Sequence, residues 1–223
     1  MLKSTDQLIT ASQFMCEGSL SEATNTILNL VKQFPNTFIY QKILGDLLYL
    51  QGNVKPAITT FEKIVKKNPN FTSALYALGI AYYRVGKLIK SIEQFEKIIA
   101  INPQLAMAYY WLGISYRHLG EEEKSIAAYK KVIEISPDSE IANYHLAGVY
   151  IFKKKYKEAI KYLNRLAKKS SENAEVLYRL GLCYHNIGAY EKAVQNYKKA
   201  LNLNPDNTRC QEMLDMIVHV DEP

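Results

Sequence analysis

The amino-acid sequence predicts an all-α fold made of stacked helix pairs, because two regular spacings and one periodicity coincide. Prolines recur at intervals of 34 residues, with one interval of 68, at Pro35, Pro69, Pro103, Pro137 and Pro205. Glycines keep the same spacing at Gly18, Gly52, Gly86, Gly120 and Gly188. Between these breakers, apolar residues recur at steps of three and four, which is the pattern of amphipathic helices. The sequence therefore predicts one unit of two helices repeated along the chain.

Division of the chain at this period gives six units that follow one another without a linker: 4–37, 38–71, 72–105, 106–139, 140–173 and 174–207. A single domain spanning 1–223 is therefore expected. In the unit 72–105, the first helix is expected over 73–85 and the second over 88–100. Residues 208–220 predict a capping helix, since one stripe carries the apolar residues Cys210, Met213, Leu214, Ile217 and Val218.

Small and large residues alternate at fixed places of each unit. Glycines stand at the eighth place of most units, and small side chains, alanine or serine, stand twelve places later. Two helices can therefore cross closely at these places. Leucines at the seventh place would fill the seam beside the glycines, and the large complementary side chains of the second helix are Phe61, Phe95, Tyr129 and Tyr197. The glycines in the middle of each unit are expected to end the first helix, because glycine adopts positive φ at little cost.

These residues form a recognisable motif: L-G-x-x-Y, then A/S-x-x-x-F/Y, then P, at a period of 34 residues. The motif resembles the tetratricopeptide repeat (TPR), and the resemblance covers nearly the whole chain. It implies a right-handed α-solenoid superhelix of helix-turn-helix units, in which the first helices line a concave groove and the second helices lie on the convex side.

Two units depart from the motif. The first has Thr10 and Ala11 where Leu-Gly is expected, so it is either a capping repeat or a mobile one. The fifth has Lys154 in place of the turn glycine and Ser171 in place of the proline. Either a local change in curvature or simple sequence drift would explain the fifth unit.

A ladder of tyrosines occupies the fifth place of the first helices, which the resemblance assigns to the groove: Tyr76, Tyr110, Tyr144 and Tyr178. The other predicted groove residues are Lys42, Tyr49, Tyr83, Arg84, Arg117, His118, Arg179 and His185. Tyrosine and arginine are enriched at binding hot spots, so the groove is predicted to bind a peptide or protein ligand. The alternative is that neighbouring tyrosines simply pack on one another.

The expected ligand carries acidic and apolar side chains, because the acidic groove places are only Asp46 and Glu175. Members of the family that bind chaperone tails carry a Lys/Asn/Asn/Lys/Arg clamp. Only Lys42 matches that clamp here, and the other places hold Asp46, Ala77, Met107 and Trp111. Binding of chaperone tails is therefore not expected.

A basic segment lies in the fifth unit, where eight of the nineteen residues in 151–169 are cationic: Lys153, Lys154, Lys155, Lys157, Lys161, Arg165, Lys168 and Lys169. This basic surface would suit an anionic membrane surface, RNA or an acidic protein. The alternative is a set of solvated lysines on a convex helix.

Catalytic and cofactor motifs are missing from the sequence, so no enzyme activity, catalytic residue or cofactor is expected. The four histidines share no i, i+4 helix face, and no metal site is predicted. A net charge of +6 is too small to indicate DNA binding by itself.

The cellular location is predicted to be cytoplasmic. The three cysteines are widely spaced, as suits a reducing compartment, and no apolar run has the length of a signal peptide or a membrane span. Contact with a membrane through partners is the alternative.

The sequence thus predicts a protein-protein interaction scaffold. The main alternative is a self-assembling homo-oligomeric scaffold at a membrane or organelle, of the magnetosome type or a pilus or secretion assembly factor. RNA binding is a lesser alternative.

Overall fold

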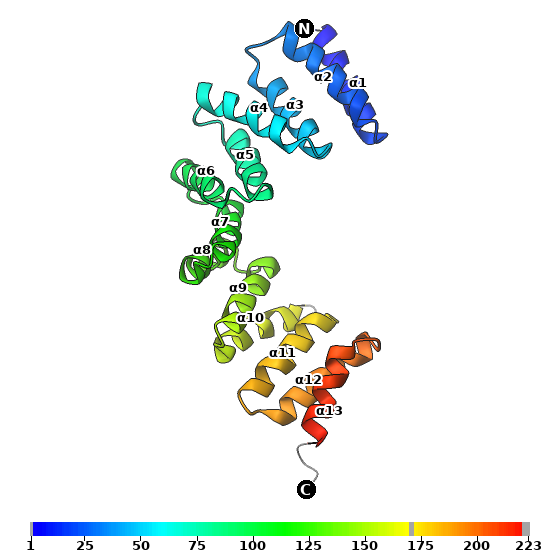
Figure 1. Ribbon diagram of the computed structural model, residues 1–223, viewed down its shortest axis with the longest axis vertical. Coiled ribbons are helices and arrows are strands. Elements are labelled where there is room, and N and C mark those ends of the chain that lie inside the picture. Colours follow the sequence, from blue (N-terminus) through cyan, green and yellow to red (C-terminus); the bar gives the residue numbers. More distant parts are fainter. Residues whose placement is uncertain (1, 170–171, 220–223) are drawn as a thin grey trace. The chain divides into compact units, whose positions relative to one another are not determined.

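The computed structural model describes residues 2–169 and 172–219, and within them all regular secondary structure is α-helical, with no strands. The helices follow one another in pairs (Figure 1). Their bounds are α1 Leu2–Cys16, α2 Leu20–Gln33, α3 Phe38–Leu50, α4 Val54–Lys67, α5 Thr72–Arg84, α6 Leu88–Ile101, α7 Ala106–His118, α8 Glu122–Ile135, α9 Glu140–Phe152, α10 Tyr156–Lys169, α11 Ala174–Asn186, α12 Tyr190–Leu203 and α13 Thr208–His219. This confirms the predicted all-α fold.

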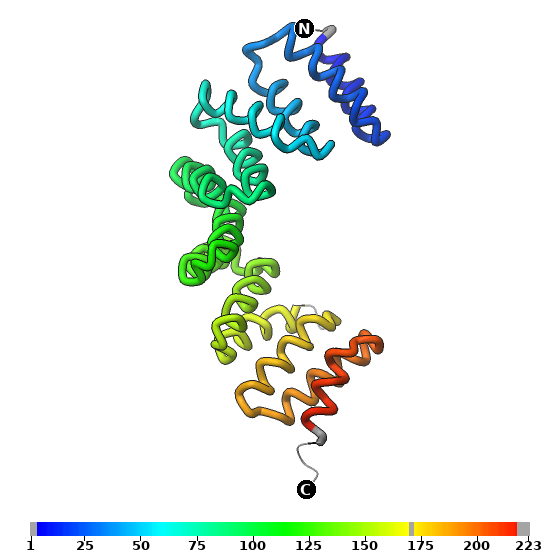
Figure 2. The backbone as a smooth tube through the Cα atoms, viewed as in Figure 1, coloured from blue at the N-terminus to red at the C-terminus, as the bar shows by residue number. Residues whose placement is uncertain are grey.

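The chain forms two compact units, Met1–Gly120 with α1–α7 and Glu121–Pro223 with α8–α13. Within each unit, every helix packs against the next one along the chain, and the backbone turns back at each helix end (Figure 2). In the first unit, the first helices of neighbouring repeats also touch, α3 against α5 and α5 against α7. The core is therefore assembled from neighbours in the sequence.

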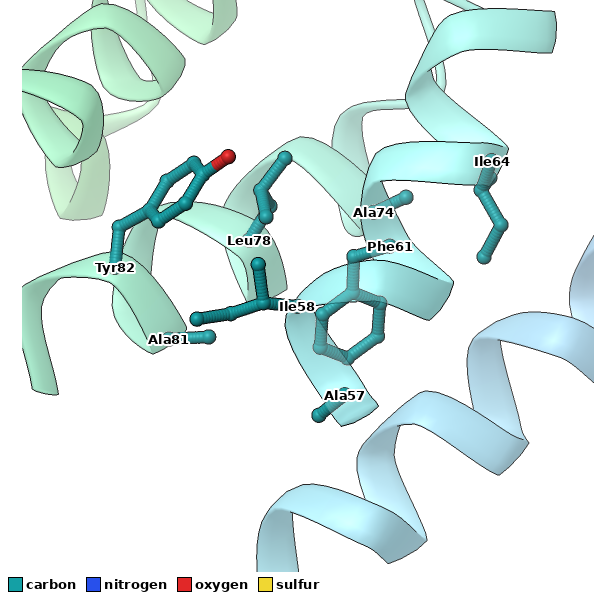
Figure 3. Packing of buried hydrophobic residues seen from close by; sticks show 8 residues of the cluster. All are labelled: Ala57, Ile58, Phe61, Ile64, Ala74, Leu78, Ala81 and Tyr82. Atoms are coloured by element: carbon teal, nitrogen blue, oxygen red, sulfur yellow. The ribbon is translucent and has the colours of Figure 1, made fainter. Parts of the chain in front are cut away.

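The predicted pairs of small and large residues set the helix crossings. A Cβ atom placed on Gly79 would lie 2.8 Å from the ring of Phe95, and one on Gly181 would lie 2.5 Å from the ring of Tyr197. Glycine is needed at these places because any side chain would overlap the aromatic ring. Figure 3 shows the buried side chains, including Phe61 and Leu78, that fill the space between α4 and α5.

The turns inside the repeats use left-handed backbone, as predicted from the glycines. Gly18, Gly52, Gly86, Gly120 and Gly188 all have positive φ, between 73° and 81°. The fifth repeat keeps this turn with Lys154 at φ 55°. A residue with a Cβ atom adopts this conformation at a cost of about 1 kcal/mol. Loss of the glycine therefore leaves the turn in place and makes it less stable; Ser171 lies outside the described residues.

The first repeat and α13 each bury apolar side chains against a neighbouring repeat. The first repeat forms a helix pair whose Ala11, Ala23 and Ile27 are buried together with Leu47 of α3. At the other end, α13 buries Cys210, Leu214 and Ile217 against α11 and α12, with Met213 partly buried. Helix α13 thus packs on the last repeat; the side chain of Val218 lies outside the described ones.

Among residues 2–169 and 172–219, none of the helices combines the length and apolar character that crossing a bilayer requires.

Candidate functional site

A cavity of 650 Å³ opens on the first helices of the first unit. Its lining is mostly apolar and includes Lys42, Asp46, Phe61, Tyr76, Ala77 and Met107. We call this cavity, together with the aromatic side chains beside it, the unit-1 groove. Three of the residues that replace the chaperone-tail clamp in the sequence, Asp46, Ala77 and Met107, thus line an apolar cavity.

One ion pair stands at the edge of this cavity. Lys42 Nζ donates a hydrogen bond to Asp46 Oδ2 at 2.6 Å, across one turn of α3. Burial raises the pKa of Asp46, and the hydrogen bond and charge of Lys42 oppose that change. The predicted cation Lys42 is therefore already paired with an acid of its own helix.

Tyr76 is held in place by the next repeat. Its hydroxyl accepts a hydrogen bond of 2.7 Å from Trp111 Nε1, and its ring lies 5.7 Å from the ring of Phe95. The rings of Tyr83 and Tyr110 lie 5.5 and 5.9 Å from that of Trp111. We call Tyr76, Tyr83, Tyr110 and Trp111 the aromatic cluster, and each of its side chains is only partly buried.

The remaining predicted residues of this groove surround the cluster. The hydroxyl of Tyr83 lies 3.2 Å from His118 Nε2, and the guanidinium of Arg84 lies 5.0 Å above the ring of Tyr49. Burial raises the pKa of Tyr83, and the charge of Arg117 opposes that rise. The structure thus places these predicted residues of the first unit on α3, α5 and α7 around one surface.

In the second unit, the ladder tyrosines contact arginines. The guanidinium of Arg179 lies 4.5 Å above the ring of Tyr144, and that of Arg209 lies 4.9 Å above Tyr178. Glu175 joins the two arginines, with 2.6 Å to Arg179 Nε and 3.6 Å to Arg209. We call these five residues the tyrosine–arginine network. Two guanidinium groups share one carboxylate, so the network keeps one positive charge.

His185 is the predicted residue that the network leaves out. Its ring packs edge-on against Tyr190 of α12, at 5.6 Å between centroids. A cavity of 210 Å³ lies beside Tyr144 in this unit and is lined by Ile141 and Val176 among others.

Sequence reasoning left two contact residues, Trp111 and Arg209, out of the predicted groove residues, although it named Trp111 at a place of the chaperone-tail clamp. The signal for Arg209 was present, because α13 continues the repeat spacing. Arg209 then falls at the second place of a first helix, which the resemblance to the TPR family also assigns to the groove. Trp111 follows Tyr76 by 35 residues, which is one repeat plus one residue. This spacing could have indicated that the two side chains lie on adjacent first helices.

The predicted basic surface lies on α10 and on the turn before it. Lys157, Lys161 and Arg165 are exposed, and the guanidinium of Arg165 lies 5.4 Å from the ring of Tyr162. Lys153 is paired with Glu123 at 2.8 Å. This ion pair raises the pKa of Lys153 and lowers that of Glu123.

A metal-binding cluster or a reactive thiol would be the kind of group on which catalysis could depend in the described part of the chain. No cluster of three or more His, Cys, Asp or Glu side chains there could hold a metal ion. Burial raises the pKa of the Cys183 thiol to about 12, so the thiol stays protonated at neutral pH and is a poor nucleophile.

Comparison with known proteins identifies the architecture and then the family. The helix pairs define an α-solenoid, a class of repeat protein in which each repeat packs on its neighbours. Family models described as tetratricopeptide repeat match residues 17–70 and 174–207, and the model of the Psidin N-terminal TPR repeats region matches 48–158. The chain belongs to the tetratricopeptide repeat family. A search of curated proteins found no significant match.

Several solved structures share the fold. A crystal structure of MamA is 26% identical, with a TM-score of 0.72 over 79% of this chain and 96% of that one. YrrB, described as a TPR protein with an unusual peptide-binding site, is 17% identical, with a TM-score of 0.72 over 83% and 96%. PilF of Pseudomonas aeruginosa is 13% identical, with a TM-score of 0.76 over 95% and 96%.

Proposed function

We propose that the protein is a non-enzymatic interaction scaffold whose unit-1 groove binds a peptide or a segment of a partner protein. The observation that carries this proposal is the apolar cavity of 650 Å³ beside the aromatic cluster. A concave apolar site with a few oriented polar groups is the usual form of a binding site.

The aromatic cluster favours binding because it is oriented before a ligand arrives. The hydrogen bond from Trp111 fixes Tyr76, so less side-chain entropy is lost on association. Tyrosine and tryptophan in such positions are frequent anchors of binding energy.

The ligand we propose has an apolar anchor and acidic neighbours. The anchor would enter the cavity between Phe61 and Ala77, where the ion pair of Lys42 and Asp46 leaves no net charge. Arg84 on the same unit would attract acidic side chains. The example of YrrB supports the idea that this fold can present a peptide-binding site.

The test is to fill the cavity. A phage-displayed library of random peptides would be selected on the purified protein, and the affinity of the selected peptides measured with the Ala77→Phe variant. We expect Ala77→Phe to weaken binding at least about tenfold, which corresponds to about 1.4 kcal/mol. The matched control is Ala127→Phe, at an exposed helical alanine in the second unit. Equal binding by Ala77→Phe, Ala127→Phe and the wild type would contradict the proposal.

Self-assembly is a second candidate, favoured by the outer helix of the first unit. On α1, Ile9 is 53% exposed and Met15 is 40% exposed, although end repeats usually present a polar outer face. Sedimentation velocity over a range of concentrations tests this candidate. Wild-type association that Ile9→Asp abolishes would support it, and a single monomer boundary at every concentration would exclude it.

For the location, we propose the cytoplasm or another reducing compartment. Cys16, Cys183 and Cys210 are all unpaired thiols in the structure, which suits that environment.

A further inference from the structure

The outer face of α10 is a stripe of basic side chains. Lys157, Lys161, Arg165 and Lys168 follow one another at steps of four, four and three residues, which places them on one side of the helix. All four are exposed, whereas the opposite side buries Ala159, Tyr162, Leu163 and Leu166. We call these four cations the basic stripe.

The turn before α10 extends this positive charge. Lys154 and Lys155 are exposed there, and Lys153 is paired with Glu123. For Lys154, Lys155, Lys157 and Lys161, the described residues supply no ion-pair partner within 4.0 Å. Among the described residues these four lysines thus have no ion-pair partner, although the charge of Lys155 contributes to the lowered pKa of Glu123.

Lys154 occupies a place where the fold favours glycine. Its φ is 55°, and the equivalent turns of the other repeats use Gly18, Gly52, Gly86, Gly120 and Gly188. The chain therefore keeps a cation in a backbone conformation that glycine would adopt with less strain. Backbone strain at an exposed cation is an observation from which we infer a role outside folding.

An exposed apolar side chain stands next to this turn. Phe152, the last residue of α9, is 75% exposed, which is the largest value among the exposed large hydrophobic side chains of the described residues. Isolated aromatic rings beside lysines are well suited to the boundary between lipid headgroups and acyl chains.

We propose that the turn between α9 and α10 and the basic stripe form a docking surface for an anionic lipid bilayer. The lysines are attracted to the negative headgroups, and each contributes about a fivefold increase in binding near the surface. Phe152 inserts its ring into the headgroup region. This surface is separate from the unit-1 groove, and its role does not depend on peptide binding.

A bilayer fits these features better than RNA does. Proteins that bind single-stranded nucleic acid combine a basic groove with several aromatic side chains on which successive bases stack. Here the cations lie on the exposed side of a helix, and the exposed ring of Phe152 stands at one end of them.

The experiment is co-sedimentation of the full chain with vesicles of phosphatidylcholine alone and of phosphatidylcholine mixed with phosphatidylserine. We expect binding to the mixed vesicles only, and a decrease as sodium chloride is raised. Replacement of both Lys157→Gln and Lys161→Gln should weaken binding about 25-fold, as two lysines each contribute about fivefold. The matched control, Lys198→Gln with Lys199→Gln on exposed places of α12, should bind as the wild type does.

Lys154→Gly separates binding from folding. Glycine relieves the backbone strain, so the thermal midpoint should rise by about 2 °C. Vesicle binding should nevertheless fall about fivefold, because one cation is lost. A purely structural role for Lys154 would change the midpoint and leave binding unchanged.

Phe152→Trp reports on insertion. The tryptophan fluorescence of this variant should shift to the blue when mixed vesicles are added. The wild type, in which Trp111 is the only tryptophan, should not show this shift. Absence of vesicle binding, equal binding to both vesicle types, or full binding by the double lysine variant would each overturn the proposal. Tighter binding of a labelled polyuridylate RNA, in competition with the vesicles, would assign the surface to RNA and overturn it as well.

Discussion

The ladder tyrosines of the two units occupy the same place in their repeats and have different partners. In the first unit, the hydroxyl of Tyr76 accepts a hydrogen bond from Trp111 beside an apolar cavity. In the second unit, the ring of Tyr144 lies under the guanidinium of Arg179, which is bonded to Glu175. The repeat thus sets the position of each tyrosine on its helix. The residue that the next repeat places against it decides whether the surface there is neutral or charged.

The largest effect should come from the core, where the two units are expected to behave alike. Leu78 and Leu180 occupy equivalent places, and each is 2% exposed. Leu78→Ala and Leu180→Ala should each lower the free energy of unfolding by about 2 to 5 kcal/mol, because each leaves a cavity. Urea denaturation followed by circular dichroism measures this loss. If one of the two changes were tolerated, the units would differ in their cores as well as their surfaces.

A smaller effect should distinguish the two tyrosine contacts. A double-mutant cycle of Tyr76→Phe and Trp111→Phe should give a coupling energy of about 1 kcal/mol, the net value of one hydrogen bond. A cycle of Tyr144→Leu and Arg179→Met should give about 0.5 to 1 kcal/mol, as for an exposed cation–π pair. Urea titrations in low and high salt should show a salt-dependent coupling for the arginine pair only. A salt-dependent coupling between Tyr76 and Trp111 would contradict the contrast.

The smallest effect concerns pH and the ion pair at the edge of the cavity. Burial raises the pKa of Asp46 above its unfolded value, so protonation of this carboxyl favours the folded state. As the pH falls through the folded-state pKa, the wild type should gain stability relative to Asp46→Asn, whose side chain does not titrate. Urea midpoints of the two proteins between pH 7 and pH 4 measure the difference. A wild type that loses stability relative to Asp46→Asn over this range would show that the bond to Lys42 outweighs burial.

Much of the fold could be predicted from the sequence, because its causes are local and repeated. The glycine turns, the close approach of Gly79 to Phe95 and the capping helix all follow from residue type and spacing. The helix bounds of the third repeat differ from those predicted by one residue, with α5 at Thr72–Arg84 and α6 at Leu88–Ile101.

The candidate site was less predictable, because it depends on contacts between repeats. The repeat spacing predicted which helix positions the tyrosines occupy. It did not predict the hydrogen bond between Trp111 and Tyr76, because this bond joins residues of different repeats. The ion pair of Lys42 with Asp46 could have been inferred from their i, i+4 spacing. The cavity could not, since it exists only where side chains of α3, α4, α5 and α7 leave the space between them unfilled.

Packing between successive helices has a consequence for how such a chain can evolve. Since each helix packs chiefly on its neighbours in the sequence within each unit, gain or loss of a whole 34-residue segment inside a unit recreates interfaces of the same kind. Duplication of a gene segment can therefore lengthen the protein without redesign of its interior. The number of sites for partners can change in this way while each existing site keeps its surroundings.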